Sequence, residues 1–302
     1  MASWGLTTAS EKAVRKVEEY GESFQVNVLD LDIVSNGSPL LYTVIMLLGK
    51  LGITEELSLD KEKLVAYITA VEAGYYRENP YHNNIHAADV TQRVVTLLHV
   101  TGAYPKAVTE LQMLAAIISA AVHDYEHPGT NNAYHVSMNN ILARTYNDQH
   151  VLENHSLSMG LELMCQPEYN FLHAQPKETQ MAFRGYMIDM VLATDIASHW
   201  DLLSAFQSKV KANVARATNL ETSEKGQQTL LLKVALKCAD LGHCALPLRQ
   251  HIDWVGRLEK EFFSQGDNEK REELPVSPLM DRSRPGPACG RNQIGFFDFV
   301  VL

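Results

Sequence analysis

The stretch Ala121-Val122-His123-Asp124-Tyr125-Glu126-His127-Pro128-Gly129 is the most informative part of the chain. An almost entirely apolar run, residues 113–122, leads into it. Such a run predicts a buried segment, and its end would carry His123 and Asp124 together out of the core. Neutral imidazole and carboxylate are suitable ligands for a divalent cation. The stretch therefore predicts a metal site at the end of a core helix.

Two further stretches carry the same kinds of side chain. Tyr81-His82-Asn83-Asn84-Ile85-His86-Ala87-Ala88-Asp89 lies upstream, and Cys238-Ala239-Asp240-Leu241 lies downstream. Asn83 or Asn84 can cap a helix, which would place His86 in its first turn and leave His82 in the preceding loop. Asp240 follows a mostly apolar segment, where an uncompensated carboxylate is costly. We expect the three stretches to meet around metal.

Each group also has an ordinary structural interpretation. His82 and His86 could simply donate to backbone carbonyls at a helix end, and residues 123–127 could form a surface loop. Glu153-Asn154-His155 could be a solvated cap at a helix boundary.

A carboxylate has two oxygens, so Asp124 could bridge two cations about 3.5–4 Å apart. Holding water or orienting a ligand is a more suitable role for His127 than direct binding.

Composition restricts the class of protein. The chain has 302 residues, enough for a sizeable core, and its net charge of −10 argues against nucleic acid as a partner. Four cysteines without paired spacing indicate reduced thiols and a cytoplasmic location. The sequence contains neither a membrane-length apolar run nor a nucleophile motif. Metal-activated water is then the natural attacking group, which indicates a metal-dependent hydrolase of a phosphate ester.

Helical periodicity dominates, without a persuasive set of alternating strands. We expect an all-α fold, a compact bundle of about a dozen helices. Residues 1–302 should form a single domain, with an N-terminal helical part (1–74) and a motif-bearing part (75–302), excised from a longer protein. The helical segments expected are 8–22, 39–48, 61–75, a helix after Pro80, 107–122, 131–154, 156–165, 177–193, 200–214, 229–239 and 252–263. Residues 266–291 should form a loop, and residues 293–301 a last element.

The motifs, taken in order, resemble the catalytic domain of class I cyclic nucleotide 3′,5′-phosphodiesterases. The first two are Tyr81-His82-Asn83-x-x-His86-Ala87 and His123-Asp124-x-x-His127-Pro128-Gly129-x-x-Asn132. The others are Leu152-Glu153-Asn154-His155, Ala193-Thr194-Asp195, Cys238-Ala239-Asp240, Glu261-Phe262-Phe263-x-Gln265-Gly266-Asp267 and Gln293-Ile294-Gly295-Phe296. Seven ordered motifs across about residues 75–300 make the resemblance specific. It implies an all-α fold of the HD/phosphodiesterase type, with a metal site in a deep pocket.

The resemblance also implies roles for individual residues. The zinc ligands would be His86, His123, Asp124 and Asp240. Asp124 would bridge to a second ion, Mg²⁺ or Mn²⁺, and a bridging hydroxide would attack phosphorus while His82 protonates the leaving 3′ oxygen. Residues that hold metal-bound water or orient ligands would be His127, Glu153, His155 and Asp195. The substrate would contact Tyr81, His243, Leu258, Gln293 and Phe296, with Gln293 on the purine edge and Leu258 and Phe296 on its faces. Glu126 matches no ligand position and should not bind the metal.

Departures from the family pattern concern specificity. His243 stands where cAMP-selective members often carry Asn, Ser156 stands where many members have a second His, and the loop 279–291 is long. A side-chain amide such as that of Gln293 can read either adenine or guanine by rotating. We therefore expect hydrolysis of both cAMP and cGMP, ending cyclic nucleotide signalling. The alternatives are a catalytically weak cyclic-nucleotide-binding module and another His-Asp metal phosphohydrolase.

Overall fold

The computed structural model describes Trp4, Val17 and residues 20–216 and 225–301, and these residues form helices and turns with no β-strand among them. Most of the helix predicted at 8–22 lies outside the described residues. The helices are α2 (Val28–Val34), α3 (Pro39–Leu51), α4 (Ile53–Glu56), α5 (Lys61–Gly74), α6 (Asn84–Val100), α7 (Glu110–Val122), α8 (Asn132–Ser137), α9 (Ile141–Thr145), α10 (Val151–Cys165), α11 (Lys177–Leu192), η2 (Ile196–Ser198), α12 (His199–Arg216), α13 (Lys225–Asp240), η4 (Gly242–Ala245), α14 (Leu248–Arg271), α15 (Gly290–Phe296) and η5 (Phe297–Val301).

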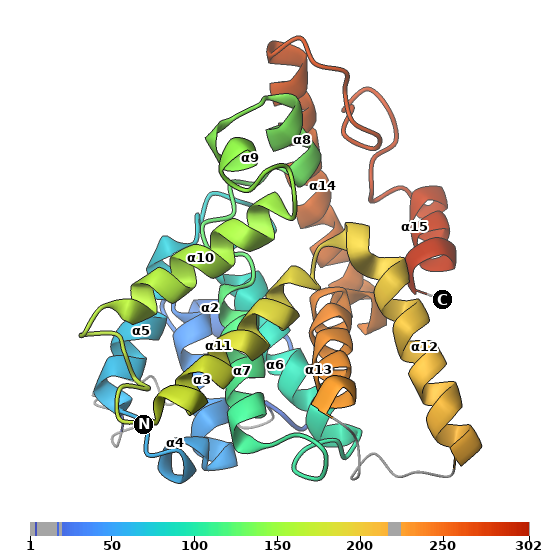
Figure 1. Cartoon of the computed structure of the whole chain (residues 1–302). Helices are drawn as coiled ribbons and strands as arrows, with labels where there is room; N and C mark the ends of the chain where they lie inside the picture. The colour runs from blue at the N-terminus through green and yellow to red at the C-terminus, as the bar shows by residue number, and fades with distance from the viewer. Residues whose placement is uncertain (1–3, 5–16, 18–19, 217–224, 302) are drawn as a thin grey trace.

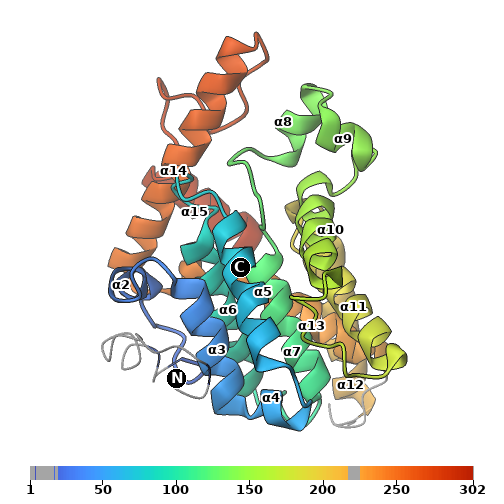
Figure 2. The same cartoon turned by 90° about the vertical axis from the view of Figure 1, so that its left-hand side faces the viewer.

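Helices α6 and α7 form the centre of the bundle, where they pack against each other and against α3, α11 and α13 (Figures 1 and 2). Every residue of α7 from Gln112 to Val122 is buried, which confirms the prediction drawn from the apolar run. His86 lies in the first turn of α6, His123 directly follows α7, and Asp240 is the last residue of α13. Because these three helices contact one another, the three motif stretches come together.

Local sequence signals explain where several helices begin and end. The Asn83 side chain accepts hydrogen bonds from the backbone N–H groups of Ile85 and His86, so it caps α6 as expected. Gly52 ends α3 with a φ of 66°, a left-handed conformation that glycine adopts without steric cost. Helix α7 begins later than residue 107, because Thr109 and Gln112 form a capping box.

The continuous helix predicted over 131–154 is wrong. The segment contains α8, α9 and the start of α10, separated by residues with positive φ, namely Asn139, Asn147, Asp148 and His150. Asn and Asp tolerate this conformation better than other non-glycine residues, which explains the breaks. Helix α10 then begins before Ser156, so Glu153 and His155 lie within the helix instead of closing the preceding one.

The loop predicted at 266–291 is also partly wrong, because α14 continues to Arg271. Figures 1 and 2 show this half of α14 extending beyond the body of the bundle with the following loop. A Cβ added to Gly266 would lie 1.8 Å from the backbone oxygen of Met280, so the glycine allows the loop to pack directly on the helix.

Among the residues that the structure describes, no single helix has the length and apolar composition to cross a membrane. The bent pair α2 and α3, which meet at 107°, passes that test only together.

Candidate metal centre

Four predicted ligands converge at the ends of α6, α7 and α13. The Nε2 atom of His86 lies 3.1 Å from Asp240 Oδ1 and 3.5 Å from Asp124 Oδ2. The Nε2 atom of His123 lies 3.1 Å from the same Asp124 oxygen and 3.5 Å from the same Asp240 oxygen. The imidazoles are almost fully buried and the carboxylates are partly open. One cation could contact both nitrogens and one oxygen of each carboxylate.

The chemistry of this donor set fits a cation. Of the nitrogens that face the carboxylates, the buried His123 Nε2 lacks a hydrogen-bond partner, which is costly for a polar nitrogen unless another group satisfies it. Burial alone would raise the pKa values of Asp124 and Asp240, but the neighbouring histidines lower both below the usual range. Two ionised carboxylates and two imidazoles are a ligand set that Zn²⁺ accepts.

His82 lies beside the four ligands but bonds to a different partner. Its Nδ1 contacts Glu261 Oε1, and Glu261 Oε2 accepts from the backbone N–H groups of Tyr81 (3.1 Å) and His82 (3.0 Å). Burial lowers the pKa of His82, but the charges of Glu261 and Asp124 outweigh it and raise the value to about 9. This imidazole is therefore held in its protonated form at neutral pH, ready to give up a proton.

His127 packs against His82 instead of joining the metal ligands. The two rings stack with centroids 4.0 Å apart and planes 25° apart. His127 Nδ1 accepts from the backbone N–H of Gly129 at 3.1 Å. Burial, with the adjacent charge of His82, lowers the pKa of His127 to about 3. A neutral ring supports the orientation of His82 without competing for its proton.

A second acidic group lies on the side of the centre formed by α10 and α11. His150 Nδ1 lies 2.7 Å from Asp195 Oδ2, and Glu153 lies within the same group. Burial, reinforced by the charges of Asp195 and Asp124, raises the pKa of Glu153 to about 7. The buried Lys237 donates to the Asp195 backbone oxygen at 2.8 Å. Glu153 can thus exchange a proton near neutral pH.

His155 is not brought to the four ligands or to His82 by any observed hydrogen bond. Its Nε2 lies 3.0 Å from Glu126 Oε2, which links α10 to the turn after α7. Ser156, next to it, donates to the Tyr125 backbone oxygen at 2.7 Å. Glu126 has a φ of 59° and directs its carboxylate to His155. His155 therefore contacts the turn that follows His123 and Asp124 through Glu126, and a role in holding metal-bound water stays a prediction.

The residues predicted to contact the substrate lie on α14, α15, η4 and the loop before α6. The Tyr81 ring is buried against His86, with centroids 4.6 Å apart, and it packs with Trp254, with Leu258 at the edge of the same cluster. Phe296, the last residue of α15, is half-buried. Tyr81 thus supports a ligand, and its contact with substrate stays a prediction.

The Gln293 amide is held at both ends. Its Nε2 donates to the Pro287 backbone oxygen and its Oε1 lies beside His251 Nε2, each at 2.9 Å. His251 in turn stacks on His243 with planes 21° apart. The amide orientation in this structure is therefore set by the protein.

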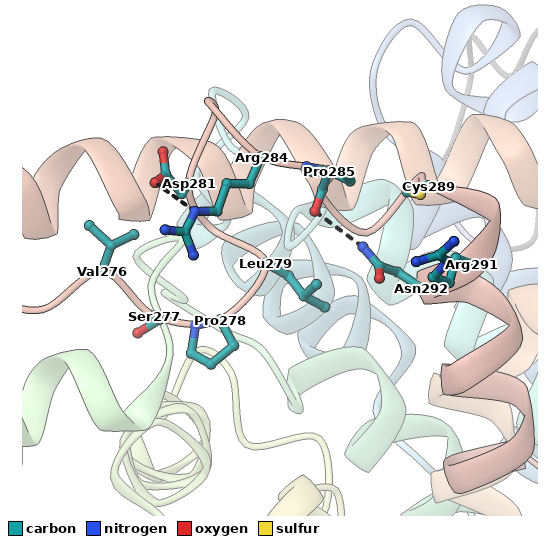
Figure 3. A pocket seen from close by; sticks show the side chains of 10 residues that line it. All are labelled: Val276, Ser277, Pro278, Leu279, Asp281, Arg284, Pro285, Cys289, Arg291 and Asn292. Atoms are coloured by element: carbon teal, nitrogen blue, oxygen red, sulfur yellow. Dashed lines mark hydrogen bonds and ion pairs between the residues drawn. The ribbon is translucent and has the colours of Figure 1, made fainter.

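A cavity of about 970 Å³ lies under the long loop (Figure 3). Arg284, Asp281 and Asn292 are among its lining residues, and Asn292 donates to the Pro285 backbone oxygen at 3.1 Å. None of the four predicted ligands lines this cavity. The deep pocket expected around the metal ligands stays a prediction.

Several contributors were not identified from sequence. Glu261 was visible only as part of a motif, because its contact with His82 spans 179 positions. His150, Lys237 and His251 carry no local spacing signal at all. Asp89, which seemed to belong with His82 and His86, instead forms a buried two-point pair with Arg93 at 2.8 Å for each bond. An Asp and an Arg four apart on one helix were the available signal.

Comparison with known proteins gives consistent matches. Residues 81–302 match the model of the 3′5′-cyclic nucleotide phosphodiesterase family. The chain is 34% identical over 301 residues to a probable 3′,5′-cyclic-AMP phosphodiesterase of Caenorhabditis elegans, covering 99% of this chain and 44% of that protein. It is 37% identical over 282 residues to a dual specificity calcium/calmodulin-dependent 3′,5′-cyclic nucleotide phosphodiesterase of Mus musculus, covering 93% and 38%. The chain thus spans less than half the length of both relatives.

A solved structure is similar over nearly the whole chain. The phosphodiesterase domain of the Salpingoeca rosetta rhodopsin phosphodiesterase superposes with a TM-score of 0.85 at 29% identity. The match covers 97% of this chain and 86% of that one. The all-α fold and its phosphodiesterase type are therefore confirmed.

Proposed function

Because this chain belongs to the 3′5′-cyclic nucleotide phosphodiesterase family, we propose that it hydrolyses 3′,5′-cyclic nucleotides to 5′-monophosphates. The observation that carries the proposal is the convergence of His86, His123, Asp124 and Asp240, where the buried His123 Nε2 lacks a hydrogen-bond partner. A family resemblance alone does not place chemistry on a chain, and this donor set supports the proposal independently of the resemblance.

Those four residues would hold Zn²⁺, and Asp124 would also help to hold a second ion, Mg²⁺ or Mn²⁺. Such ions, when bound, activate water for attack on phosphorus and neutralise charge on the phosphate. The charges of Asp195 and Asp124 both contribute to the raised pKa of Glu153, which supports a position of Glu153 and Asp195 near Asp124. We assign them to holding water there.

His82 is proposed as the general acid. Hydrolysis forms a bond from water oxygen to phosphorus and breaks the bond from phosphorus to the 3′ oxygen, which must gain a proton. Glu261 occupies Nδ1 of His82, so Nε2 is the position from which a proton can leave. The ring stacked on His127 keeps this orientation. A raised pKa keeps His82 protonated until the bond to the 3′ oxygen breaks.

Both cAMP and cGMP are proposed substrates. The Gln293 amide would have to rotate to read both bases, and its hydrogen bonds in this structure oppose that rotation. Turning Gln293 over would break its bonds to His251 and Pro287. At a net cost of about 1 kcal/mol each, about 2 kcal/mol is lost, equivalent to a preference of about 30-fold. This preference is below the roughly 100-fold ratio that would contradict dual specificity.

The direct test is turnover of each cyclic nucleotide by the purified chain, with product identified by chromatography. We expect 5′-monophosphate from both, with kcat/KM values within about 100-fold of each other. Tight binding without product would support the binding-module alternative. Turnover of nucleoside phosphates in preference to cyclic nucleotides would support the broader His-Asp phosphohydrolase alternative. We also propose further regulatory domains outside this chain, and a cytoplasmic location, which the four free cysteines support.

A further inference from the structure

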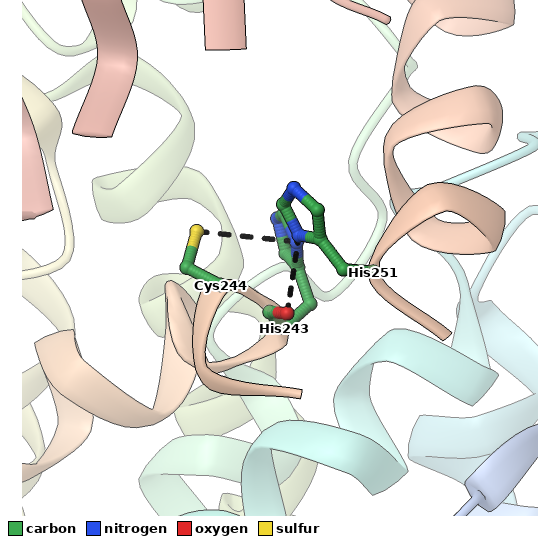
Figure 4. Close-up of side chains that lie close together, drawn as sticks. All are labelled: His243, Cys244 and His251. Atoms are coloured by element: carbon green, nitrogen blue, oxygen red, sulfur yellow. Dashed lines mark hydrogen bonds between the residues drawn. The ribbon is translucent and has the colours of Figure 1, made fainter. Parts of the chain in front are cut away.

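A second group of metal-ligating side chains lies where η4 joins α14, apart from the four residues described above. His243 and Cys244 come from η4, and His251 comes from the first turn of α14 (Figure 4). Their candidate ligand atoms lie within 4.8 Å of one another. Both imidazoles are buried, whereas the thiol is half-buried and therefore reachable from solvent.

Hydrogen bonding determines which nitrogen of His251 carries a lone pair. The Pro287 backbone oxygen can only accept, so the Gln293 atom beside it is Nε2, and Oε1 must face His251. His251 Nε2 then has to donate, which leaves its Nδ1 without a proton in the neutral ring. That unprotonated Nδ1 also lies 3.2 Å from the His243 backbone oxygen, so two acceptors face each other there unless a cation or a proton lies between them. A histidine that donates one N–H to a protein acceptor and offers the other nitrogen is typical of metal ligation.

Nδ1 of His243 faces Nδ1 of His251. His243 Nδ1 lies 3.1 Å from His251 Nδ1, and Cys244 Sγ lies 4.0 Å from His243 Nδ1 (Figure 4). A tetrahedral Zn²⁺ with bonds of about 2.0–2.1 Å to nitrogen and about 2.3 Å to sulfur needs nitrogens about 3.3–3.4 Å apart and sulfur about 3.6 Å from nitrogen. Both observed separations lie within about 0.4 Å of these values, so small side-chain movements would suffice.

The turn that carries these residues is firmly placed. A Cβ on Gly242 would lie 2.4 Å from Arg93 Cδ, so only glycine lets η4 pack this closely on the buried Arg93. Arg93 is itself fixed by its two bonds to Asp89. Burial, followed by the adjacent His251, lowers the pKa of His243 to about 3, so its ring is neutral and available as a ligand.

We propose that His243 Nδ1, Cys244 Sγ and His251 Nδ1 form a third metal site that binds Zn²⁺, with water in the fourth position. Two imidazoles and a thiolate favour a borderline-to-soft ion over Mg²⁺. Binding replaces the hydrogen bond between the rings: the His243 proton moves from Nδ1 to Nε2, and the Cys244 thiol releases its proton to solvent. No oxidant or reductant is needed.

Cobalt substitution tests the site directly, because a thiolate bound to Co²⁺ gives a charge-transfer absorption that imidazoles and carboxylates do not. The four-residue centre at His86 contains no sulfur, so the band does not come from that centre, and variants distinguish Cys244 from the other thiols. We expect the band in the purified chain loaded with Co²⁺ and its loss in Cys244→Ser. Cys289→Ser, which removes another half-buried thiol, is the matched control and should keep the band.

Metal analysis after loading with Zn²⁺ and desalting should show one equivalent less in Cys244→Ser than in Cys289→Ser. A second experiment uses only the unaltered chain, so its result does not depend on whether a variant folds. Zn²⁺ should protect Cys244 from alkylation, as read by mass spectrometry of the labelled peptide, and a chelator should restore labelling. A charge-transfer band that survives Cys244→Ser, or alkylation of Cys244 that Zn²⁺ leaves unchanged, would overturn the proposal.

Discussion

Replacing Glu261 by Gln should separate the proton-donating function of His82 from the packing around it. The amide of Gln can still accept through its oxygen from the backbone N–H groups of Tyr81 and His82, as Glu261 Oε2 does at 3.1 and 3.0 Å. Its NH₂ group would then face His82 Nδ1 and donate to it. Such a donor favours the neutral imidazole, whereas the carboxylate favours the protonated one.

The size of the effect follows from the raised pKa. Glu261 supplies the largest charge that opposes burial and holds the pKa of His82 at about 9, against an ordinary value of 6.5. Losing this contribution should return the pKa to about 6.5 or below, a change of about 3.4 kcal/mol between the two protonation states. At about pH 7.5 the protonated fraction would fall from nearly complete to about one tenth, so kcat should fall about 10-fold.

The assay is the pH dependence of kcat for cAMP hydrolysis, with Asp253→Asn, an exposed change of equal charge on the same helix, as control. Activity that needs protonated His82 is lost as pH rises through its pKa. The alkaline limb of Glu261→Gln should therefore move to lower pH by about 2.5 units or more, while that of Asp253→Asn stays in place. Bound cations would lower the pKa in all three proteins and leave the comparison intact. An alkaline limb that does not move would refute the assignment of Glu261.

Three further changes have defined outcomes. Asp240→Ala removes the oxygen 3.1 Å from His86 Nε2, so metal content by elemental analysis and turnover should both be lost; retained metal would contradict the ligand assignment. His82→Ala should keep the metal and lower kcat by about 100- to 10,000-fold, the range for general acid catalysis, so that loss of metal would show a different role. Gly266→Ala places a Cβ 1.8 Å from the Met280 oxygen and should lower the free energy of unfolding in urea by about 1–3 kcal/mol or more. Gly256→Ala, on the same helix with no atom within 4 Å, should raise it by about 0.5–1 kcal/mol, and equal effects at the two positions would refute the packing argument.

The predictable parts of the fold are those where burial requires apolar residues or where a helix end requires a particular residue type. The run 113–122 is apolar on almost every face, because α7 is surrounded by other helices. This pattern predicts a core helix. The ends of α3 were visible because Pro39 and Gly52 have strong local preferences. The meeting of His86, His123 and Asp240 was inferred from ligand chemistry, since periodicity alone does not show which helices pack together.

The errors have two physical origins. The breaks at Asn139 and at 147–150 depend on single residues in left-handed conformations, which helical periodicity does not register, although the Asn and Asp clusters were a usable signal. The contacts of His82 with Glu261 and of Asp195 with Lys237 join residues far apart in the chain. No local pattern encodes such pairs. The contact between His82 and Glu261 is therefore known only from the position of α14 in the structure.

Removal and return of metal tests the central claim most directly. The purified chain would be treated with a chelator, desalted and assayed for conversion of cAMP to 5′-AMP before and after addition of Zn²⁺ and Mg²⁺, with Asp240→Ala in parallel. The account predicts that chelation abolishes turnover and that metal restores it in the unaltered chain but not in the variant. Turnover that survives complete removal of metal would contradict it.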